Sequence, residues 1–423
     1  MRDYLKVQSL FAQIATEDMA AKDMSQNVRP RYYSGMLERI AMDATKSHAP
    51  RYCDRALIQC LLEQIGAYND PCTRLLIGDG AAWKPQSPGF SVRRYEDVLI
   101  VTRVFDDFRF TPGDVITKMQ NNSIVDYHKQ VWRTLRCKIT ENEDWQVALQ
   151  FSNTVHVRRG NGEERLRLMR FPMLKQQCET SIRFMDGICI IRLDTLETKE
   201  EILDLLRANA SQIAACSGTV LDLRQCHSQN AGFEVLLPLL ARQGETRNIL
   251  APEQGVYMLY SQGNKRLFRA ELLAQLRREQ NSQVRNEIEA LLSQLEDKSG
   301  WVFEPAEPEE DGAITPVSCG KLVILSDGET GADAEAFILA AKRLGRATVV
   351  GRNSMGAMDY CRPQLRALDD SMALVYSSAM RASAYEGNHM NGIGISADIH
   401  IPWTPEFLKK DLDMEAAIDV INS

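Results

Sequence analysis

The sequence lacks paired cysteines, a long apolar run and an excess of basic residues. Its ten cysteines form no CxxC pair, so we expect neither a zinc site nor a disulfide framework, but buried reduced thiols in a cytoplasmic protein. No stretch approaches the roughly 18–20 apolar residues that cross a bilayer, and the N-terminal segment has no signal-peptide core. The net charge of -7 argues against a nucleic-acid partner.

The proportions of hydrophobic and charged residues are those of an ordinary globular protein. The chain has 423 residues, of which 44% are hydrophobic and 25% charged, and this length accommodates two or three domains. The patterning predicts a helical region over 1–85, a strand-rich region over 86–172, and alternating strands and helices over 173–423.

The strand-rich region has an order of elements that looks like a PDZ domain. Strands are predicted over 96–105, 145–152 and 164–171 from apolar alternation. Between the first two lie a turn at Pro112-Gly113, a short strand, a second turn and an amphipathic helix. The whole order, rather than any single motif, carries this prediction.

The last region predicts an α/β fold. Apolar strands over 187–194, 218–225 and 320–327 alternate with amphipathic helices, which indicates a largely parallel sheet covered on both faces. An insertion over about 241–318 contains a charged helix at 269–297. We interpret that helix as a solvated surface element, with a lid over a cleft as the alternative.

A loop, a helix and a strand follow one another between Ser326 and Arg352. Thr330 is predicted as the N-cap, so that Gly331 and Ala332 lie in the first helical turn. Backbone N–H groups there are suited to hold an anion or the oxyanion of an attacked carbonyl. The place resembles the entry of a nucleophile, yet Ala332 has no side chain that reacts.

A series of motifs resembles the C-terminal processing peptidases, also called tail-specific proteases, which are related to the tricorn core protease. In chain order these are "DPCTRL", the PDZ-like region, "VLDLRQCHSQNAG", "ETGADAEAF" with "LGRATVVGR", and "NGIGISADIHIP". The resemblance implies a ClpP/crotonase-like α/β core with an inserted PDZ domain. It also implies serine endopeptidase activity on peptides or unfolded proteins, without a cofactor or metal, and it leaves an oligomer open.

The resemblance places the catalytic roles on residues that do not match them. The nucleophilic serine, three positions before Glu335, corresponds to Ala332. The lysine base of the processing branch corresponds to Ala357. The histidine of the tricorn-like branch corresponds to Cys72, and its glutamate to Asn391. Serine hydrolysis needs a nucleophile and a proton acceptor, so these replacements remove the expected chemistry.

Other residues are candidates for the remaining roles. His227 and His389 are candidate bases, with surface histidines as the alternative. The N–H of Asp333 and one near Ser228 are candidate oxyanion donors.

Substrate binding has its own candidates, Thr330, Gly331, Arg74 and Arg224. For the two arginines, structural salt bridges are the alternative to binding a peptide carboxylate. Cys72 is expected to be a small buried thiol rather than a nucleophile.

Two functional hypotheses follow. The first is a serine peptidase seen without its nucleophile through an engineered Ser→Ala change, which the retained Thr330 and Glu335 favour. The second is a natural pseudopeptidase that binds peptides or proteins, which the replacements at Cys72, Ala357 and Asn391 favour. A crotonase-like acyl-CoA enzyme shares the core fold but does not account for the PDZ-like insertion.

Overall fold

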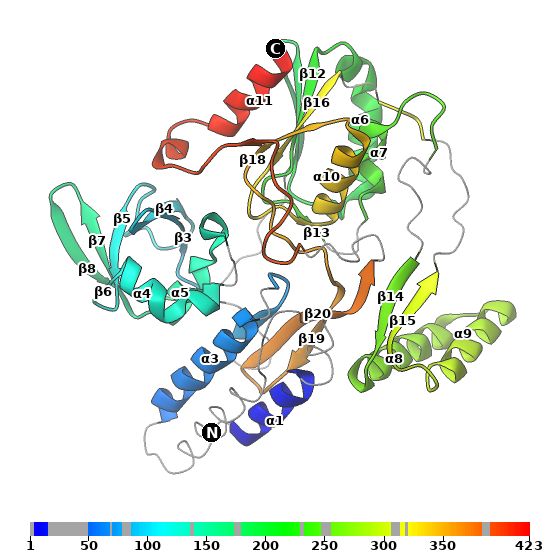
Figure 1. Ribbon diagram of the computed structural model, residues 1–423, viewed down its shortest axis with the longest axis horizontal. Coiled ribbons are helices and arrows are strands. Elements are labelled where there is room, and N and C mark those ends of the chain that lie inside the picture. The colour runs from blue at the N-terminus through cyan, green and yellow to red at the C-terminus, as the bar shows by residue number, and fades with distance from the viewer. Residues whose placement is uncertain are drawn as a thin grey trace.

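The structure is a computed structural model with three units, each built around a sheet (Figure 1). It describes residues 4–15, 50–67, 70–77, 86–135, 139–172, 179–228, 232–246, 255–305, 314–317, 320–382 and 390–423. We call the three units the core unit, the middle unit (86–172) and the basal unit. Residues 16–49 of the predicted helical region 1–85 lie outside the described residues.

The core unit is a six-stranded sheet in the order β10-β11-β12-β16-β18-β21, parallel except between β10 and β11. Its strands are β10 Thr180–Met185, β11 Ile188–Leu193, β12 Gly218–Asp222, β16 Lys321–Ser326, β18 Thr348–Gly351 and β21 Ile399–His400. The central strand β12 is buried at every position. Burial of every position is typical of a parallel strand with both faces covered, and it explains why the sequence of β12 does not alternate.

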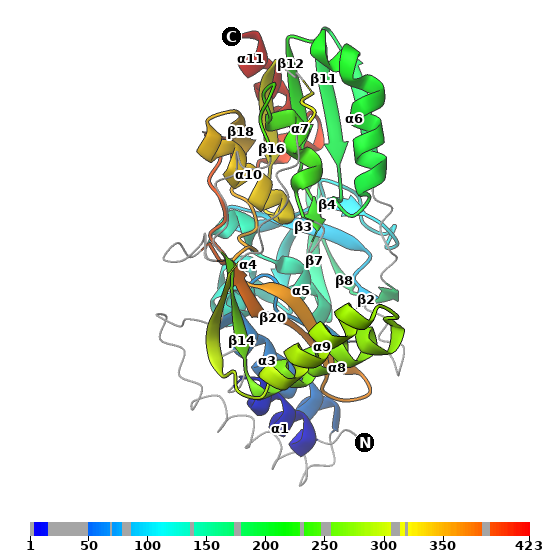
Figure 2. The same cartoon turned by 90° about the vertical axis from the view of Figure 1, so that its right-hand side faces the viewer.

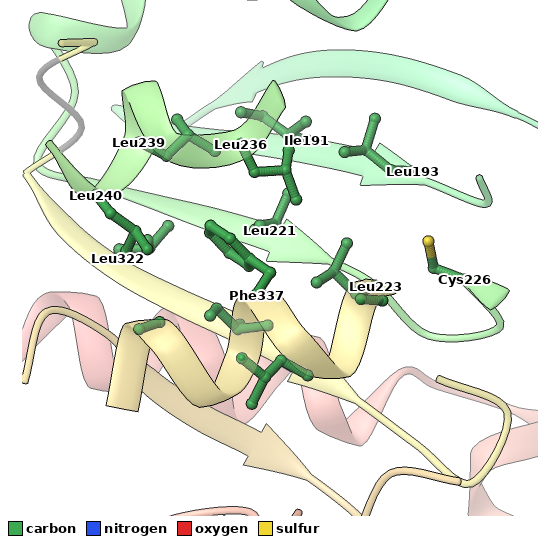
Figure 3. Packing of buried hydrophobic residues seen from close by; sticks show 14 of the residues in the cluster. Ile191, Leu193, Leu221, Leu223, Cys226, Leu236, Leu239, Leu240, Leu322 and Phe337 are labelled. Atoms are coloured by element: carbon green, nitrogen blue, oxygen red, sulfur yellow. The ribbon is translucent and has the colours of Figure 1, made fainter. Parts of the chain in front are cut away.

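Helices cover both faces of the core sheet, as predicted. One face packs against α6 Lys199–Ala214, α7 Leu237–Leu240 and α10 Asp333–Leu344, and the other against α11 Leu412–Asn422. Figure 2 shows α6 and α11 on opposite sides of the sheet. Phe337 of α10 lies among leucines of β12, β16 and α7 (Figure 3). Its full burial contributes about 2–3 kcal/mol and fixes the start of α10 over the strand ends.

The middle unit is a second sheet in the order β3-β4-β5-β7-β8, with β6 paired to β5. Its elements are β3 Phe90–Tyr95, β4 Val98–Val104, β5 Val115–Met119, β6 Asn122–Ser123, α4 Ile124–Val131, α5 Trp145–Phe151, β7 Thr154–Arg159 and β8 Gly162–Arg167. The short strands β2 Gln86–Ser87 and β9 Phe171–Pro172 pair beside it. The predicted turn at Pro112-Gly113, the strand after it and the amphipathic helix are confirmed.

One prediction for this unit is wrong. Residues 145–151 form helix α5, not a strand. Trp145, Ala148 and Leu149 are all buried, and they stand at the i, i+3, i+4 spacing of a helical face. In so short a segment the apolar residues are also compatible with the alternating pattern of a strand. Packing of the helix on the sheet therefore decides which structure forms.

The basal unit joins segments from both ends of the chain. Its strands are β1 Arg74–Ile77, β14 Gly255–Tyr260, β15 Gly300–Pro305, β19 Cys361–Ala367 and β20 Met372–Ala382. Helices α1 Tyr4–Ile14 and α3 Pro50–Ala67 pack on β20. The N-terminal region therefore shares a sheet with the insertion and with residues 361–382.

The predicted single charged helix is two helices, α8 Gln262–Arg278 and α9 Ser282–Gln294. Asn281 caps α9, because its side chain accepts the N–H of Gln283 at 2.9 Å. The pair packs on β14 and β15 and lies away from the core sheet (Figure 1). In the described part of the chain, no helix is long and apolar enough to cross a bilayer.

Candidate active site

Three turns of the chain meet at the N-terminus of α10. The 327–332 turn is joined to the 354–357 turn by the N–H of Met355, which donates to Thr330 O at 2.8 Å. The 354–357 turn is joined to the 390–395 turn by the N–H of Ser354, which donates to Ile395 O at 3.1 Å. A Cβ on Gly356 would lie 2.2 Å from Met390 O, so glycine is needed for this close approach.

Ala332 sits at the centre of this arrangement in a strained conformation. Its φ is 55° and its ψ is -114°, a combination that costs an alanine about 1–3 kcal/mol. Strain of this kind is typical of a nucleophile held on a sharp strand-to-helix turn. The tight turn is thus retained although the side chain is a methyl group.

The predicted helix start is wrong by two residues. Helix α10 begins at Asp333 with Ala332 as the N-cap, and Gly331–Ala332 form the short strand β17. Thr330 instead closes the preceding turn: its hydroxyl accepts the N–H of Asp327 at 3.0 Å and donates to Leu223 O at 2.9 Å. Its side chain is fully buried, so it supports the site and does not face a ligand.

Glu335 joins the 327–332 turn to the 354–357 turn through hydrogen bonds. One carboxylate oxygen accepts the N–H groups of Ala332 at 2.9 Å and Ala357 at 2.7 Å. The other accepts the Ser354 hydroxyl at 2.5 Å and the Gly356 N–H at 2.6 Å. Burial raises the pKa of Glu335, and these four donors offset part of that effect. The N–H of Ala332 is therefore engaged within the protein.

The structure brings together Cys72 and Ala357, the two positions to which the resemblance assigns alternative bases. The Cys72 thiol lies 3.8 Å from Ala357 O, and the two side chains are only 4% and 3% exposed. Asp70 fixes the loop by accepting the Cys72 N–H at 2.9 Å and the Thr73 hydroxyl at 2.8 Å. Because Ala357 and Ala332 donate to one oxygen of Glu335, all these positions belong to one site.

Asn391 borders the same site. Its N–H donates to Asp359 at 3.2 Å, and the next N–H, of Gly392, donates to Gly356 O at 3.3 Å. The turn with the expected glutamate position thus packs on the turn with the expected lysine position. His389 lies outside the described residues.

His227 lies beside the nucleophile position. Strand β13, His227–Ser228, pairs in parallel with Gly331–Ala332, and a Cβ on Gly331 would lie 2.4 Å from His227 Nδ1. Within the described residues, this buried nitrogen has no hydrogen-bond partner. Burial, with a contribution from Arg74, lowers the pKa of His227 to about 4, so the imidazole is neutral at pH 7.

Ser228 and Asp333 hold the loops around the site through their side chains. The Ser228 hydroxyl accepts the Leu196 N–H at 2.7 Å, and Asp333 accepts the Gly232 N–H at 3.0 Å. Both contacts order the segments from which an oxyanion N–H is expected. The oxyanion role itself stays a prediction.

The contacts of Arg224 support its structural alternative. Its guanidinium pairs with Asp222 at 2.7 Å, Asp411 at 2.7 Å and Asp413 at 3.2 Å, which ties the start of α11 to the sheet. Arg74 is exposed and donates to Pro71 O at 3.3 Å.

A cavity of about 700 Å³ lies where the three units meet. It is lined by Arg74 and Leu75 of the basal unit, by Arg93, Arg103, Trp145 and Gln146 of the middle unit, and by Gln225, Asp327, Glu329 and Met355 of the core unit. It therefore reaches the 327–332 and 354–357 turns that frame the candidate site.

Two arginines of the middle unit hold the core turns, and sequence reasoning missed both. Arg93 pairs with Asp327 at 3.1 Å, and Arg103 donates to Gln225 at 2.9 Å. Burial opposes ionisation of Asp327, but Arg93 and Arg352 outweigh it and lower its pKa. Neither arginine has a local sequence signal, because its partner lies more than a hundred positions away.

No group of three or more His, Cys, Asp or Glu side chains within the described ranges is placed to hold a metal ion. The polar groups at the site are a histidine, an enclosed carboxylate and backbone amides. These suit binding of a polypeptide backbone and proton transfer by an imidazole.

Comparison with known proteins agrees with this geometry. No curated protein matches the sequence. The chain is similar in fold to mature CPAF complexed with lactacystin, at 13% identity and a TM-score of 0.65 over 99% of this chain and 97% of that chain. A second structure of mature CPAF matches at 13% identity and a TM-score of 0.63, over 99% and 96%.

The photosystem II D1 C-terminal processing protease matches at 15% identity and a TM-score of 0.44, over 100% of this chain and 98% of that chain. Residues 245–401, which contain the α10 turn, the 354–357 turn and the 390–395 turn, match the model of Peptidase family S41. Over these residues the chain is therefore similar to peptidase family S41.

Proposed function

We propose that this protein is a pseudopeptidase, which binds extended polypeptide at an S41-type site without cleaving it. The observation that carries the proposal is the contact between Cys72 and Ala357 beside Ala332. The nucleophile position and both expected base positions converge, and none of the three side chains is suited to its role. In this proposal the core unit is ClpP/crotonase-like and the middle unit is a PDZ-like insertion.

The chemistry at these positions supports binding over hydrolysis. Acyl transfer needs a hydroxyl or thiolate nucleophile next to a base. Ala332 offers a methyl group, and Cys72 is a buried thiol within hydrogen-bonding reach of a carbonyl. The strained turn and the Glu335 contacts nevertheless keep the frame of the site. A binding module derived from a peptidase would keep the backbone geometry of the site and lose the side chains that react.

The cavity supplies the room for a ligand. At about 700 Å³ it accommodates several residues of an extended chain, and it reaches the α10 turn from between the units. Backbone pairing gives such a ligand affinity without a defined sequence. The sequence has no CxxC pair, which supports a reducing, cytoplasmic setting for this binding.

The test uses carboxymethylated α-lactalbumin as an unstructured polypeptide. We expect the protein to bind it, measured by fluorescence anisotropy, and to leave it uncleaved over a day. Ala332→Ser alone should stay inactive, because no competent base then faces the new hydroxyl. The absence of binding, or cleavage by Ala332→Ser alone, overturns the pseudopeptidase proposal.

A triple variant tests whether the positions are correctly identified. Ala332→Ser with Cys72→His and Asn391→Glu restores the residues of the tricorn-like branch. If the three positions form one site, we expect this variant to cleave the polypeptide above the background of the single variant. If the triple variant is folded but does not cleave the polypeptide, the assignment of these positions is wrong.

The second candidate is a serine peptidase in which His227 is the base. It is favoured by the buried Nδ1 of His227, which has no partner among the described residues and lies against Gly331. In this case Ala332→Ser cleaves the polypeptide, and adding His227→Gln abolishes the cleavage. The pair of variants therefore separates the two candidates.

A further inference from the structure

The middle unit presents an edge strand to the interior of the molecule. Among the strands that the structure describes, β3 pairs with β4 on one side only, and α5 contacts β3. An edge strand carries a row of backbone N–H and C=O groups that an extended peptide can pair with. Peptide recognition by a PDZ domain uses such an edge. Whether the edge of β3 is open therefore decides how this unit recognises a ligand.

The side chain of Gln146 occupies part of this edge. With its amide turned to satisfy both contacts, the Gln146 nitrogen donates to Phe90 O at 3.2 Å. The Gln146 oxygen accepts the N–H of Val92 at 3.0 Å. One residue of a strand added in parallel would make this same pair of hydrogen bonds. The amide of Gln146 therefore occupies two backbone groups of β3 that a residue of a bound peptide would use.

Helix α5 is held firmly in the position that makes these contacts. At the start of the helix, Trp145 Nε1 donates to Glu143 at 2.8 Å. The guanidinium of Arg170 donates to the carbonyls of Leu149, Gln150 and Ser152 near the end of the helix, at 2.7–3.1 Å. Gln146 is thus presented to β3 by a helix fixed at both ends.

The loop before β3 is poorly suited to hold a carboxylate. Capture of a chain terminus needs backbone N–H groups that point at the ligand. Pro88 has no N–H. The N–H of Gly89 donates to the hydroxyl of Ser87 at 3.1 Å. Two successive positions of this loop therefore offer no free donor to a C-terminal carboxylate.

We infer that Gln146 is a built-in plug of the β3 edge, and that this chain does not select ligands by their C-terminal carboxylate. Extended polypeptide adds to β3 only when the Gln146 amide leaves Phe90 and Val92. This inference rests on the proposed PDZ-like nature of the middle unit and sharpens its ligand class to internal extended segments. In the plugged state, polypeptide reaches the core site through the cavity.

The test compares Gln146→Ala with the matched control Gln150→Ala, which lies on the same helix but bonds Gln86 instead of β3. The probe is a fluorescein-labelled ten-residue peptide of alternating valine and threonine, made with a free carboxylate and with a C-terminal amide. We expect Gln146→Ala to bind both forms about tenfold more tightly than the wild type or Gln150→Ala, a gain of about 1.4 kcal/mol. Equal affinity in all three proteins, or a tenfold preference for the free carboxylate, overturns the inference.

Hydrogen exchange gives a readout that needs no ligand. Removal of the Gln146 amide exposes the Val92 N–H, so its exchange should accelerate at least tenfold in Gln146→Ala and stay unchanged in Gln150→Ala. Gln146→Met, which fills the same space without polar atoms, repeats the comparison should the alanine variant unfold. Unchanged exchange at Val92 refutes the plug. Failure of the wild type to bind carboxymethylated α-lactalbumin refutes the proposed function instead, so the two outcomes are distinct.

Discussion

The neutral state of His227 gives the sharpest test of the candidate site. Burial, with a contribution from Arg74, lowers the pKa of this imidazole to about 4. The chain has six histidines, so their ring signals can be followed individually by NMR. We expect one signal to keep the shift of a neutral ring from pH 8 down to about pH 5, and His227→Gln to remove that signal. A midpoint near 6.5 for all six refutes the buried position of the ring.

The same shift makes a stability prediction with a defined sign. In the unfolded chain the imidazole titrates near 6.5, so between about pH 4 and 6.5 the unfolded state binds more protons than the native state. The stabilisation is complete above about pH 6.5 and is lost as the pH falls toward 4. At about 1.4 kcal/mol for each pH unit, the full loss is about 3 kcal/mol, of which about 2 kcal/mol is lost by pH 5.

Urea unfolding followed by tryptophan fluorescence measures this loss. Carboxylates also titrate in this range, so the comparison is between the wild type and His227→Gln at pH 7 and pH 5. We expect the difference in unfolding free energy between the two proteins to change by about 2 kcal/mol in favour of the variant at pH 5. A difference that is the same at both pH values contradicts the argument.

Three substitutions probe the packing and charges around the site. Gly331→Ala should lower the unfolding free energy by about 1–3 kcal/mol, because the new Cβ would lie 2.4 Å from His227 Nδ1; urea unfolding at pH 7 measures this, and a neutral result contradicts the contact. Glu335→Gln should cost about 3 kcal/mol in the same assay, since an NH₂ group then faces N–H donors; full stability would show that the carboxylate is not needed. Arg352→Met removes the guanidinium 2.8 Å from the fully buried Asp413, so calorimetry should show a loss of about 3 kcal/mol, and an unchanged melting temperature argues against this pair.

Much of the core unit follows from local pattern alone. The apolar runs at 187–194, 218–225 and 320–327 predict buried parallel strands, and all three are found in the core sheet, with slightly shorter bounds. The pattern fails at 145–151, where a seven-residue apolar segment fits both periods and packing selects the helix. It also merges α8 and α9, because charged residues continue across the break that Asn281 caps.

The candidate site, too, is only partly predictable from the sequence. The resemblance to the processing peptidases points to Ala332, Glu335 and Cys72, each of which belongs to a short motif. It does not show that Cys72 contacts Ala357, which lies 285 positions away. Nor does it reveal that Arg93 holds Asp327, or that Gln146 covers the edge of β3. Such contacts join segments that are far apart in the sequence, and no periodicity in one segment encodes the neighbour in another.

By itself, the sequence determined the α/β core, the turn, short strand and amphipathic helix of the middle unit, and the absence of a reacting side chain at residue 332. These depend on residue type and on spacing within about twenty positions, where hydrogen bonding and burial act along one segment. Only the tertiary structure decided that the strained turn is retained, that Glu335 joins the 327–332 turn to the 354–357 turn, and that the ring of His227 is neutral. Those features depend on desolvation and on contacts between distant segments, which exist only once the sheet and its helices have packed.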